Sequence, residues 1–172
     1  MINNEFTTTI TADPGPWYLS HYHWAESENT NATRRTDGSL GPGSGGTVNF
    51  DPRGRPIAVP TVCPNTGGVR NVVMPDFLVL GHELIHAERY TRGARFPFRS
   101  EEYHTFQASI DFHVLLPFPF GLFRIPLGTR ERTASIRKEE LATIGLASND
   151  DCDITENDLR KEHRLNLRGA WE

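Results

Sequence analysis

The sequence contains little cysteine. Only Cys63 and Cys152 occur in its 172 residues, and they form no CxxC pair. A disulfide framework or a zinc site built from thiolates needs more cysteines at closer spacing. We therefore expect reduced thiols, and a metal site would have to use other ligands.

An excess of positive charge is also missing. Lys and Arg number 18 against 22 Asp and Glu, which gives a formal net charge of -4. Proteins that bind nucleic acids normally carry a clustered basic face that neutralises phosphates. We therefore expect no nucleic-acid partner.

Long hydrophobic runs are absent as well. The most apolar stretch, residues 114–127, is too short to span a bilayer and is interrupted by three prolines. Residues 1–16 have neither the basic nor the apolar region of a Sec signal peptide. The sequence predicts no transmembrane segment, and export from a bacterium would follow a non-Sec route.

The length and the distribution of turn residues suggest one domain, residues 1–172, which is long enough to bury a core. Residues 1–70 should be loop-rich, because Ser, Asn, Gly and Pro cluster between 26 and 70. Within this part, residues 47–50 and 57–59 are candidate short strands.

Three helices are expected in the rest of the chain. The strongest signal covers residues 75–91, from Pro75 to a stop at Gly93. A second helix should run from about 134 to 144, and a third from Thr155 to about 164, with a capping box; together they form the segment 134–168.

Two segments between these helices are less clear. Residues 100–112 fit a helix or a strand equally well by periodicity. The Phe/Pro-rich run that follows is either core or an exposed apolar binding surface, and core is the default expectation for its aromatic residues, Phe112, Phe118, Phe120 and Phe123.

The first helix carries the motif His82-Glu83-Leu84-Ile85-His86. Two histidines at i and i+4 project from one side of a helix, so both imidazoles can reach one zinc ion. A glutamate directly after the first histidine lies beside that metal, where it can act as a general base toward water. We therefore expect His82 and His86 as metal ligands and Glu83 as the catalytic residue.

The alternative is a surface helix with two solvated histidines and an ordinary salt-bridging glutamate. The flanking residues disfavour it, because ionisable groups are rarely placed in an apolar setting unless they are paired or bound to metal. These apolar flanks are Leu78, Val79, Leu80, Leu84 and Ile85.

A catalytic zinc usually needs a third protein ligand and one open position. Arg89 and Arg92 occupy the positions at which a metzincin would have its glycine and third histidine. A carboxylate from a later helix remains, and we favour Glu140, because on a helix it shares a face with Ile136, Thr143 and Ile144. The alternatives are Glu139, then Glu101, Glu102 and Asp111, whereas His21, His23, His104 and His113 lack a paired metal-binding spacing.

Three blocks of the sequence, HELIHAERYTRG, EELATIGL and ITENDLRKEHRLNLR, resemble the NleD-like effector metalloproteases that bacteria inject into host cells. Related domains look like the C-terminal toxin modules of Rhs-type polymorphic toxins. The resemblance implies a compact zincin-like α+β domain with a small sheet, one Zn²⁺ per chain, and a second helix that supplies the third ligand. It also implies a protein substrate in the cytosol of a target cell, such as a mitogen-activated protein kinase, and an immunity protein or delivery apparatus as partners.

Other residues of these blocks have open roles. Arg160 and Arg168 are expected to form packing salt bridges with Glu139 or Glu156, rather than to contact the transition state. Tyr90 and Tyr103 are candidate donors to a developing oxyanion. Two other functions are kept as alternatives: a zinc-binding interaction domain without turnover, and a zinc amidase that acts on a non-protein peptide.

Overall fold

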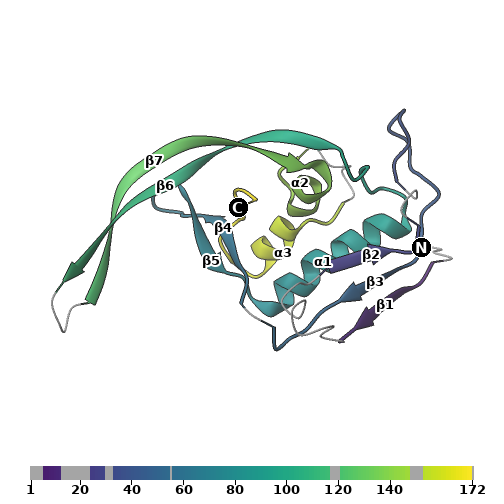
Figure 1. Ribbon diagram of the computed structural model, residues 1–172, viewed down its shortest axis with the longest axis horizontal. Helices are drawn as coiled ribbons and strands as arrows, with labels where there is room; N and C mark the ends of the chain where they lie inside the picture. Colours follow the sequence, from purple (N-terminus) through teal and green to yellow (C-terminus); the bar gives the residue numbers. More distant parts are fainter. Residues whose placement is uncertain are drawn as a thin grey trace.

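The computed structural model describes residues 6–12, 24–29, 33–54, 56–116, 121–147 and 153–171. Its architecture is α+β, with three helices and two sheets among these residues. In Figure 1, helix α1 (Asp76–Thr91) lies between the N-terminal sheet and the pair α2 (Lys138–Ile144) and α3 (Glu156–Glu162). Helix α1 therefore contacts both parts of the molecule.

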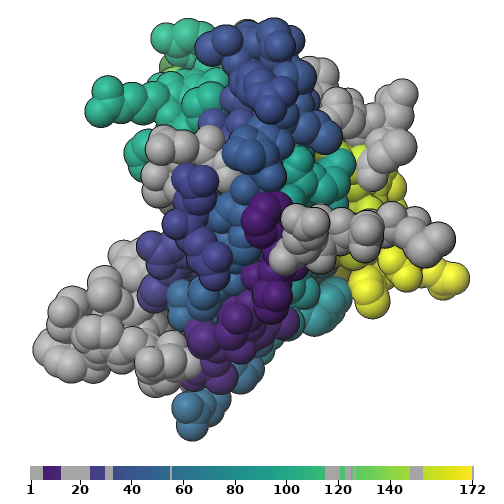
Figure 2. Space-filling model, turned by 90° about the vertical axis from the view of Figure 1, so that its right-hand side faces the viewer, coloured from purple at the N-terminus to yellow at the C-terminus, as the bar shows by residue number. Residues whose placement is uncertain are grey.

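The N-terminal sheet has three short strands in the order β1-β3-β2. Strand β3 (Gly46–Asn49) pairs in parallel with β1 (Thr8–Thr11) and antiparallel with β2 (Trp24–Ser27). Figure 2 shows β1 in purple and the segment leading to β3 in blue on one face of the molecule. The sheet and α1 are joined by a hydrogen bond from the Tyr90 hydroxyl to the carbonyl of Ala25, 3.1 Å long.

The second sheet has four strands in the order β4-β5-β6-β7. Strand β4 (Ala58–Val62) is antiparallel to β5 (Val69–Val73), and β5 meets β6 (Glu101–Leu116) in parallel at one residue pair. Strands β6 and β7 (Gly121–Arg137) form a long antiparallel hairpin, which extends from the body as a curved arm (Figure 1). The base of this arm leads directly into α2.

The core forms where α1 meets the start of the second sheet. Val59, Met74, Leu78 and Val79 make its central cluster, and Leu78 is completely buried. The spacing of Leu78, His82 and Ile85 on α1 is the reason that the histidines lie on a buried side of the helix. No helix in the described part of the chain has the length and apolar character needed to span a membrane.

The predicted first helix is confirmed. Pro75 is its N-cap, Asp76 lies in its first turn, and Arg92 is its C-cap. Gly93 follows with φ +66°, and a Cβ there would lie 2.3 Å from the carbonyl oxygen of Gly41. Glycine is therefore required at this helix end for its conformation and for its close contact.

The other helix predictions are partly wrong. Residues 134–137 belong to β7, because they pair with residues 101–104 of β6, so α2 begins at Lys138. The stop at Gly145 is confirmed, with φ +90°. The third helix has the predicted capping box between Thr155 and Asp158 but ends at Glu162, two residues earlier than expected.

The structure also shows the conformation of the segments that the sequence left undecided. Residues 101–112 are strand, and the candidate strands near 47–50 and 57–59 correspond to β3 and β4. The expectation of core is wrong for Phe112, which is 56% exposed on the hairpin arm. Phe118 and Phe120 lie outside the described residues, as does the side chain of Phe123.

Candidate metal centre

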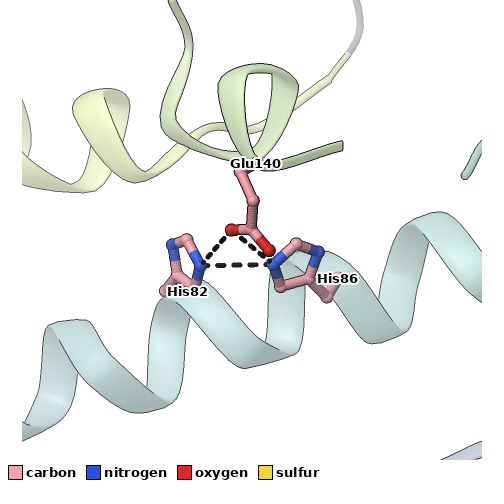
Figure 3. Close-up of side chains that lie close together, drawn as sticks. All are labelled: His82, His86 and Glu140. Atoms are coloured by element: carbon pink, nitrogen blue, oxygen red, sulfur yellow. Dashed lines mark hydrogen bonds and ion pairs between the residues drawn. The ribbon is translucent and has the colours of Figure 1, made fainter. Parts of the chain in front are cut away.

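Three ligand atoms from two helices meet above the middle of α1. His82 and His86 direct their Nε2 atoms toward each other at 3.2 Å. Glu140, in the first turn of α2, places Oε2 3.3 Å from each of these nitrogens (Figure 3). Both histidines are 6% exposed, so the three atoms form a buried triangle that could hold a metal ion.

The size of the triangle fits a tetrahedral zinc ion. Zinc binds nitrogen and carboxylate oxygen at about 2.0–2.1 Å, which places two ligand atoms of a tetrahedron about 3.3 Å apart. The three separations found, 3.2, 3.3 and 3.3 Å, match this value. Glu140 Oε2 is also buried and accepts no hydrogen bond within the described residues, as expected for an atom that faces a cation.

The other ring nitrogen of His82 is held by a buried carboxylate. Glu156 of α3 is fully buried and accepts a hydrogen bond from His82 Nδ1 at 2.9 Å. Arg160 Nε and Arg168 Nη1 donate to the same carboxylate at 2.6 and 2.8 Å. This arrangement fixes the ring so that Nε2 faces the triangle.

His86 is held in a similar way by residues of α2. Its Nδ1 lies 3.3 Å from Glu139 Oε1 and 3.1 Å from the hydroxyl of Thr143. Glu139 in turn accepts hydrogen bonds from Arg89 Nε, at 3.0 Å, and from the backbone N–H of Phe96, at 2.8 Å. Each histidine therefore has a carboxylate on the ring edge opposite the triangle.

These contacts set the protonation of the metal-free centre. Burial disfavours the charged form of His86, but the neighbouring carboxylates of Glu140 and Glu139 outweigh it and raise its pKa well above the ordinary value. The pKa of His82 is also raised, because the carboxylates of Glu140 and Glu156 outweigh the effect of its burial. Burial raises the pKa of Glu140, yet the two histidines lower it far below its usual range. Without metal, the triangle is held together by charge-assisted contacts.

The pKa of Glu156 is also displaced. Burial would raise it, but the hydrogen bond from His82 and the charges of Arg168 and Arg160 lower the pKa to about 2. This carboxylate therefore stays ionised near neutral pH and can balance positive charge on the ring of His82.

A cavity of about 270 Å³ opens beside the triangle, and Glu83 lines it together with His82, His86 and Glu140. Glu83 is 9% exposed, and its carboxylate has no hydrogen-bond partner among the described residues. An unengaged carboxylate next to a metal-binding triangle is suited to accept a proton from a bound molecule.

Aromatic residues also line this cavity, among them Trp171 and Tyr90. Trp171 stacks on the ring of His82 with centroids 6.2 Å apart, and the Arg168 guanidinium lies over the Trp171 ring. Tyr90 also lines the cavity, and burial raises the pKa of its hydroxyl. Of the two tyrosines considered as oxyanion donors, Tyr103 is 80% exposed and does not line the cavity.

The other candidate ligands lie elsewhere. Glu101 accepts from the Ser135 hydroxyl, Glu102 faces Lys138, and Asp111 lines a separate pocket on the hairpin. His104 contacts the carbonyl of Gly169. None of the described alternatives joins the cluster of metal-ligating atoms, which consists of His82, His86 and Glu140. His21 and His23 lie outside the described residues, and His113 is exposed on β6.

The expected packing role of the basic residues in the third block is supported by their contacts. Arg160 and Arg168 both bind Glu156, and Asn157 exchanges two hydrogen bonds with the backbone of Arg168. Sequence reasoning treated Glu156 only as a salt-bridge partner and missed its contact with His82. Its place one residue after the N-cap Thr155 gave no sign of burial, because acidic residues are common in an exposed first turn.

Comparison with known proteins places the chain in a family. The family model Peptidase_M91, described as "Effector protein", matches residues 3–171, nearly the whole chain. No curated protein and no solved structure matches the chain. With three potential metal ligands beside an open cavity on α1, the chain belongs to this NleD-like family of effector peptidases.

Proposed function

We propose that this chain is a zinc-dependent endopeptidase that hydrolyses an intracellular protein of a target cell. The observation that carries the proposal is the cavity in which the free carboxylate of Glu83 lies beside the triangle of His82, His86 and Glu140. Membership of the effector peptidase family supports a peptidase activity. Two imidazoles and one carboxylate are also a ligand set that catalytic zinc commonly uses.

In this proposal His82, His86 and Glu140 hold one zinc ion per chain. When bound, zinc would supply Lewis-acid activation of water and of the scissile carbonyl. Glu156 and Glu139 keep the two rings oriented through their Nδ1 atoms, at 2.9 and 3.3 Å. Such outer carboxylates raise the basicity of histidine ligands and fix their orientation.

Glu83 is the general base of the reaction. It accepts a proton from the attacking water and passes it to the nitrogen of the leaving amine, which departs as the peptide bond breaks. Its position directly after His82 on α1 fixes its backbone relative to the ligands. Because its carboxylate has no competing partner in the described part of the chain, it is available for this transfer.

The alternative of a structural zinc site is disfavoured by the same geometry. A structural site fills its fourth position with a protein ligand, usually Cys or His. The metal-ligating cluster of the described residues has three members and opens to a cavity. An amidase with a small polar substrate would use a similar centre, so the nature of the substrate separates these functions.

The effector family supports a substrate inside a host cell. A mitogen-activated protein kinase is the first substrate to test, because the chain resembles enzymes associated with that target. We further propose a zincin-like arrangement in one domain, and secretion by a non-Sec route. We also propose that, as a toxin module, the chain has an immunity protein as a binding partner.

Glu83→Gln tests the mechanism, with Glu88→Gln as a matched control on the exposed side of the same helix. Each zinc-loaded chain is incubated with a eukaryotic cytosolic extract, and new protein N-termini are identified by mass spectrometry. We expect wild type and Glu88→Gln to cut the same proteins, and Glu83→Gln to cut them about 10²–10⁴-fold more slowly. Zinc content should be one per chain in all three.

Two results would contradict the proposal. Full activity of Glu83→Gln would remove Glu83 as the base. Absence of new N-termini from zinc-loaded wild type, both in the extract and with purified mitogen-activated protein kinases, would remove the endopeptidase.

A further inference from the structure

The cavity beside the metal centre also contains two arginines, Arg95 and Arg137, that form no ion pair with an acidic residue of the described ranges. Arg95 follows α1, and its guanidinium lies over the ring of Tyr90, 4.6 Å from the centroid. Arg137 is the last residue of β7, and its guanidinium lies over the ring of Phe98 at 4.3 Å. Each charge is thus positioned by an aromatic ring rather than by a counter-ion.

The surroundings of Arg95 favour the binding of an anion. Its Nε is buried and donates no hydrogen bond within the described residues. A buried, unsatisfied guanidinium nitrogen is costly, and such donors normally find a partner. No carboxylate in the described ranges forms an ion pair with it, so the cavity itself is where a partner would arrive.

The acidic residues of the cavity do not fill this role. Glu139 is bound by Arg89, and Glu140 faces the Nε2 atoms of the two histidines. Glu83 forms no ion pair with either of the cavity arginines in the described part of the chain. The positive charge of Arg95 and Arg137 is therefore available to a bound molecule.

The two arginines differ in depth. Arg95 is half-buried, whereas Arg137 and its partner Phe98 are exposed. A peptide that crosses the cavity would thus meet Arg137 at the rim and Arg95 further in. Arginine presents a planar set of donors that suits carboxylate and phosphate groups.

We infer that Arg95 and Arg137 form a subsite for an anionic side chain of the peptide substrate, close to the scissile bond. This inference rests on the proposed peptidase function and names its substrate class. The shared chemistry is a negatively charged oxygen group, which an Asp or Glu carboxylate or a phosphorylated side chain can supply.

Binding is tested first, because it does not depend on turnover. Zinc-loaded full-length chain carrying Glu83→Gln is titrated with blocked pentapeptides that have Glu, Gln or phosphoserine at the centre and alanine elsewhere. The Nε–Hε NMR signal of Arg95 and the backbone amide signals report binding. We expect the Glu and phosphoserine peptides to bind about tenfold or more tightly than the Gln peptide, as for charge-assisted hydrogen bonds.

Variants then assign the preference to the two arginines. In the same Glu83→Gln background, Arg95→Ala and Arg137→Ala should each reduce the Glu-over-Gln ratio toward one, while Arg137→Glu should favour a lysine-centred peptide. Arg132→Ala is the matched control, because Arg132 is exposed on the same strand as Arg137 and does not line the cavity. Because Arg137 is exposed, we expect the Arg137→Ala chain to fold, and it tests the inference even if Arg95→Ala does not fold.

A cleavage assay distinguishes failure of the anionic subsite from failure of the proposed peptidase function. Wild type with zinc is given a proteome-derived peptide library, and the products are sequenced by mass spectrometry. Cleavage with an acidic or phosphorylated residue enriched at one position, lost in Arg137→Ala and kept in Arg132→Ala, supports both. Cleavage without that enrichment, or equal binding of the Glu and Gln peptides, overturns the subsite. Selective binding of anionic peptides without any cleavage supports the subsite and contradicts the peptidase.

Discussion

Replacing Glu156 by glutamine tests whether this buried carboxylate holds His82 ready for a metal. The carboxylate accepts three hydrogen bonds, from His82 Nδ1, Arg160 Nε and Arg168 Nη1. Glutamine keeps the size of the side chain but has one acceptor oxygen and one amide group, which is a donor. In either orientation the amide group faces a donor, and two buried arginines lose their counter-ion.

The structure sets the expected magnitudes. Removing one partner from a buried ion pair costs about 3–5 kcal/mol, and the sharing of Glu156 by two arginines favours the upper half of this range. Loss of an outer carboxylate weakens metal binding about 10–100-fold, or roughly 1.4–2.7 kcal/mol. Zinc at about 1,000 times its dissociation constant stabilises a folded chain by about 4 kcal/mol, so excess zinc should restore folding of the variant.

Two assays on one preparation measure these effects. Urea denaturation gives the free energy of unfolding with and without zinc, and competition with a chromogenic chelator gives the zinc affinity. Glu162→Gln is the matched control, since Glu162 is an exposed residue of the same helix. An unchanged zinc affinity in the folded Glu156→Gln chain would refute the role of Glu156 in orienting His82. An unchanged unfolding free energy would refute the ion-pair reasoning.

Three further predictions concern the metal ligands, the core and the pH dependence. Glu140→Ala should abolish stoichiometric zinc binding, whereas Glu139→Ala should weaken it about 10–100-fold, as measured by mass spectrometry under native conditions. Leu78→Ala should lower the free energy of unfolding by about 2–5 kcal/mol in urea denaturation, because Leu78 is fully buried. In the metal-free chain, the raised pKa of His86 contributes stability that is complete below its ordinary pKa of about 6.5 and is lost as pH rises through the raised value. Unfolding by urea should therefore be easier at pH 9 than at pH 6 with a chelator, and zinc should stabilise the chain more at pH 9, because only neutral imidazole binds metal.

Features that depend on local sequence were the ones that could be predicted. The i, i+4 spacing of His82 and His86 fixes their common side on any helix, and Pro75 and Gly93 mark where that helix begins and ends. The capping box at Thr155 is equally local. These signals act within one or two turns, so they do not depend on how distant segments pack.

Features that depend on distant partners could not be predicted. Residues 134–137 could form a helix by themselves, but their backbone groups pair with residues 101–104, and this pairing overrides local propensity. The burial of Glu156 depends on Arg168, which lies in a separate segment twelve positions later and donates to its carboxylate. The exposure of Phe112 follows from the extension of the β6–β7 hairpin beyond β4 and β5.

The neighbouring residues Glu139 and Glu140 show how a prediction can rest on an element that is partly wrong. Glu140 was favoured because a helix would place it on one face with Ile136, yet Ile136 lies on β7. Thr143 and Ile144 are part of α2, are buried, and define the same face without it. Adjacent helical residues point about 100° apart, and here they contact opposite ring edges of His86, Glu140 at Nε2 and Glu139 at Nδ1. Since α2 begins directly after β7, a shift of one residue in the end of that strand would rotate both carboxylates, so the register of the hairpin determines which glutamate faces the metal position.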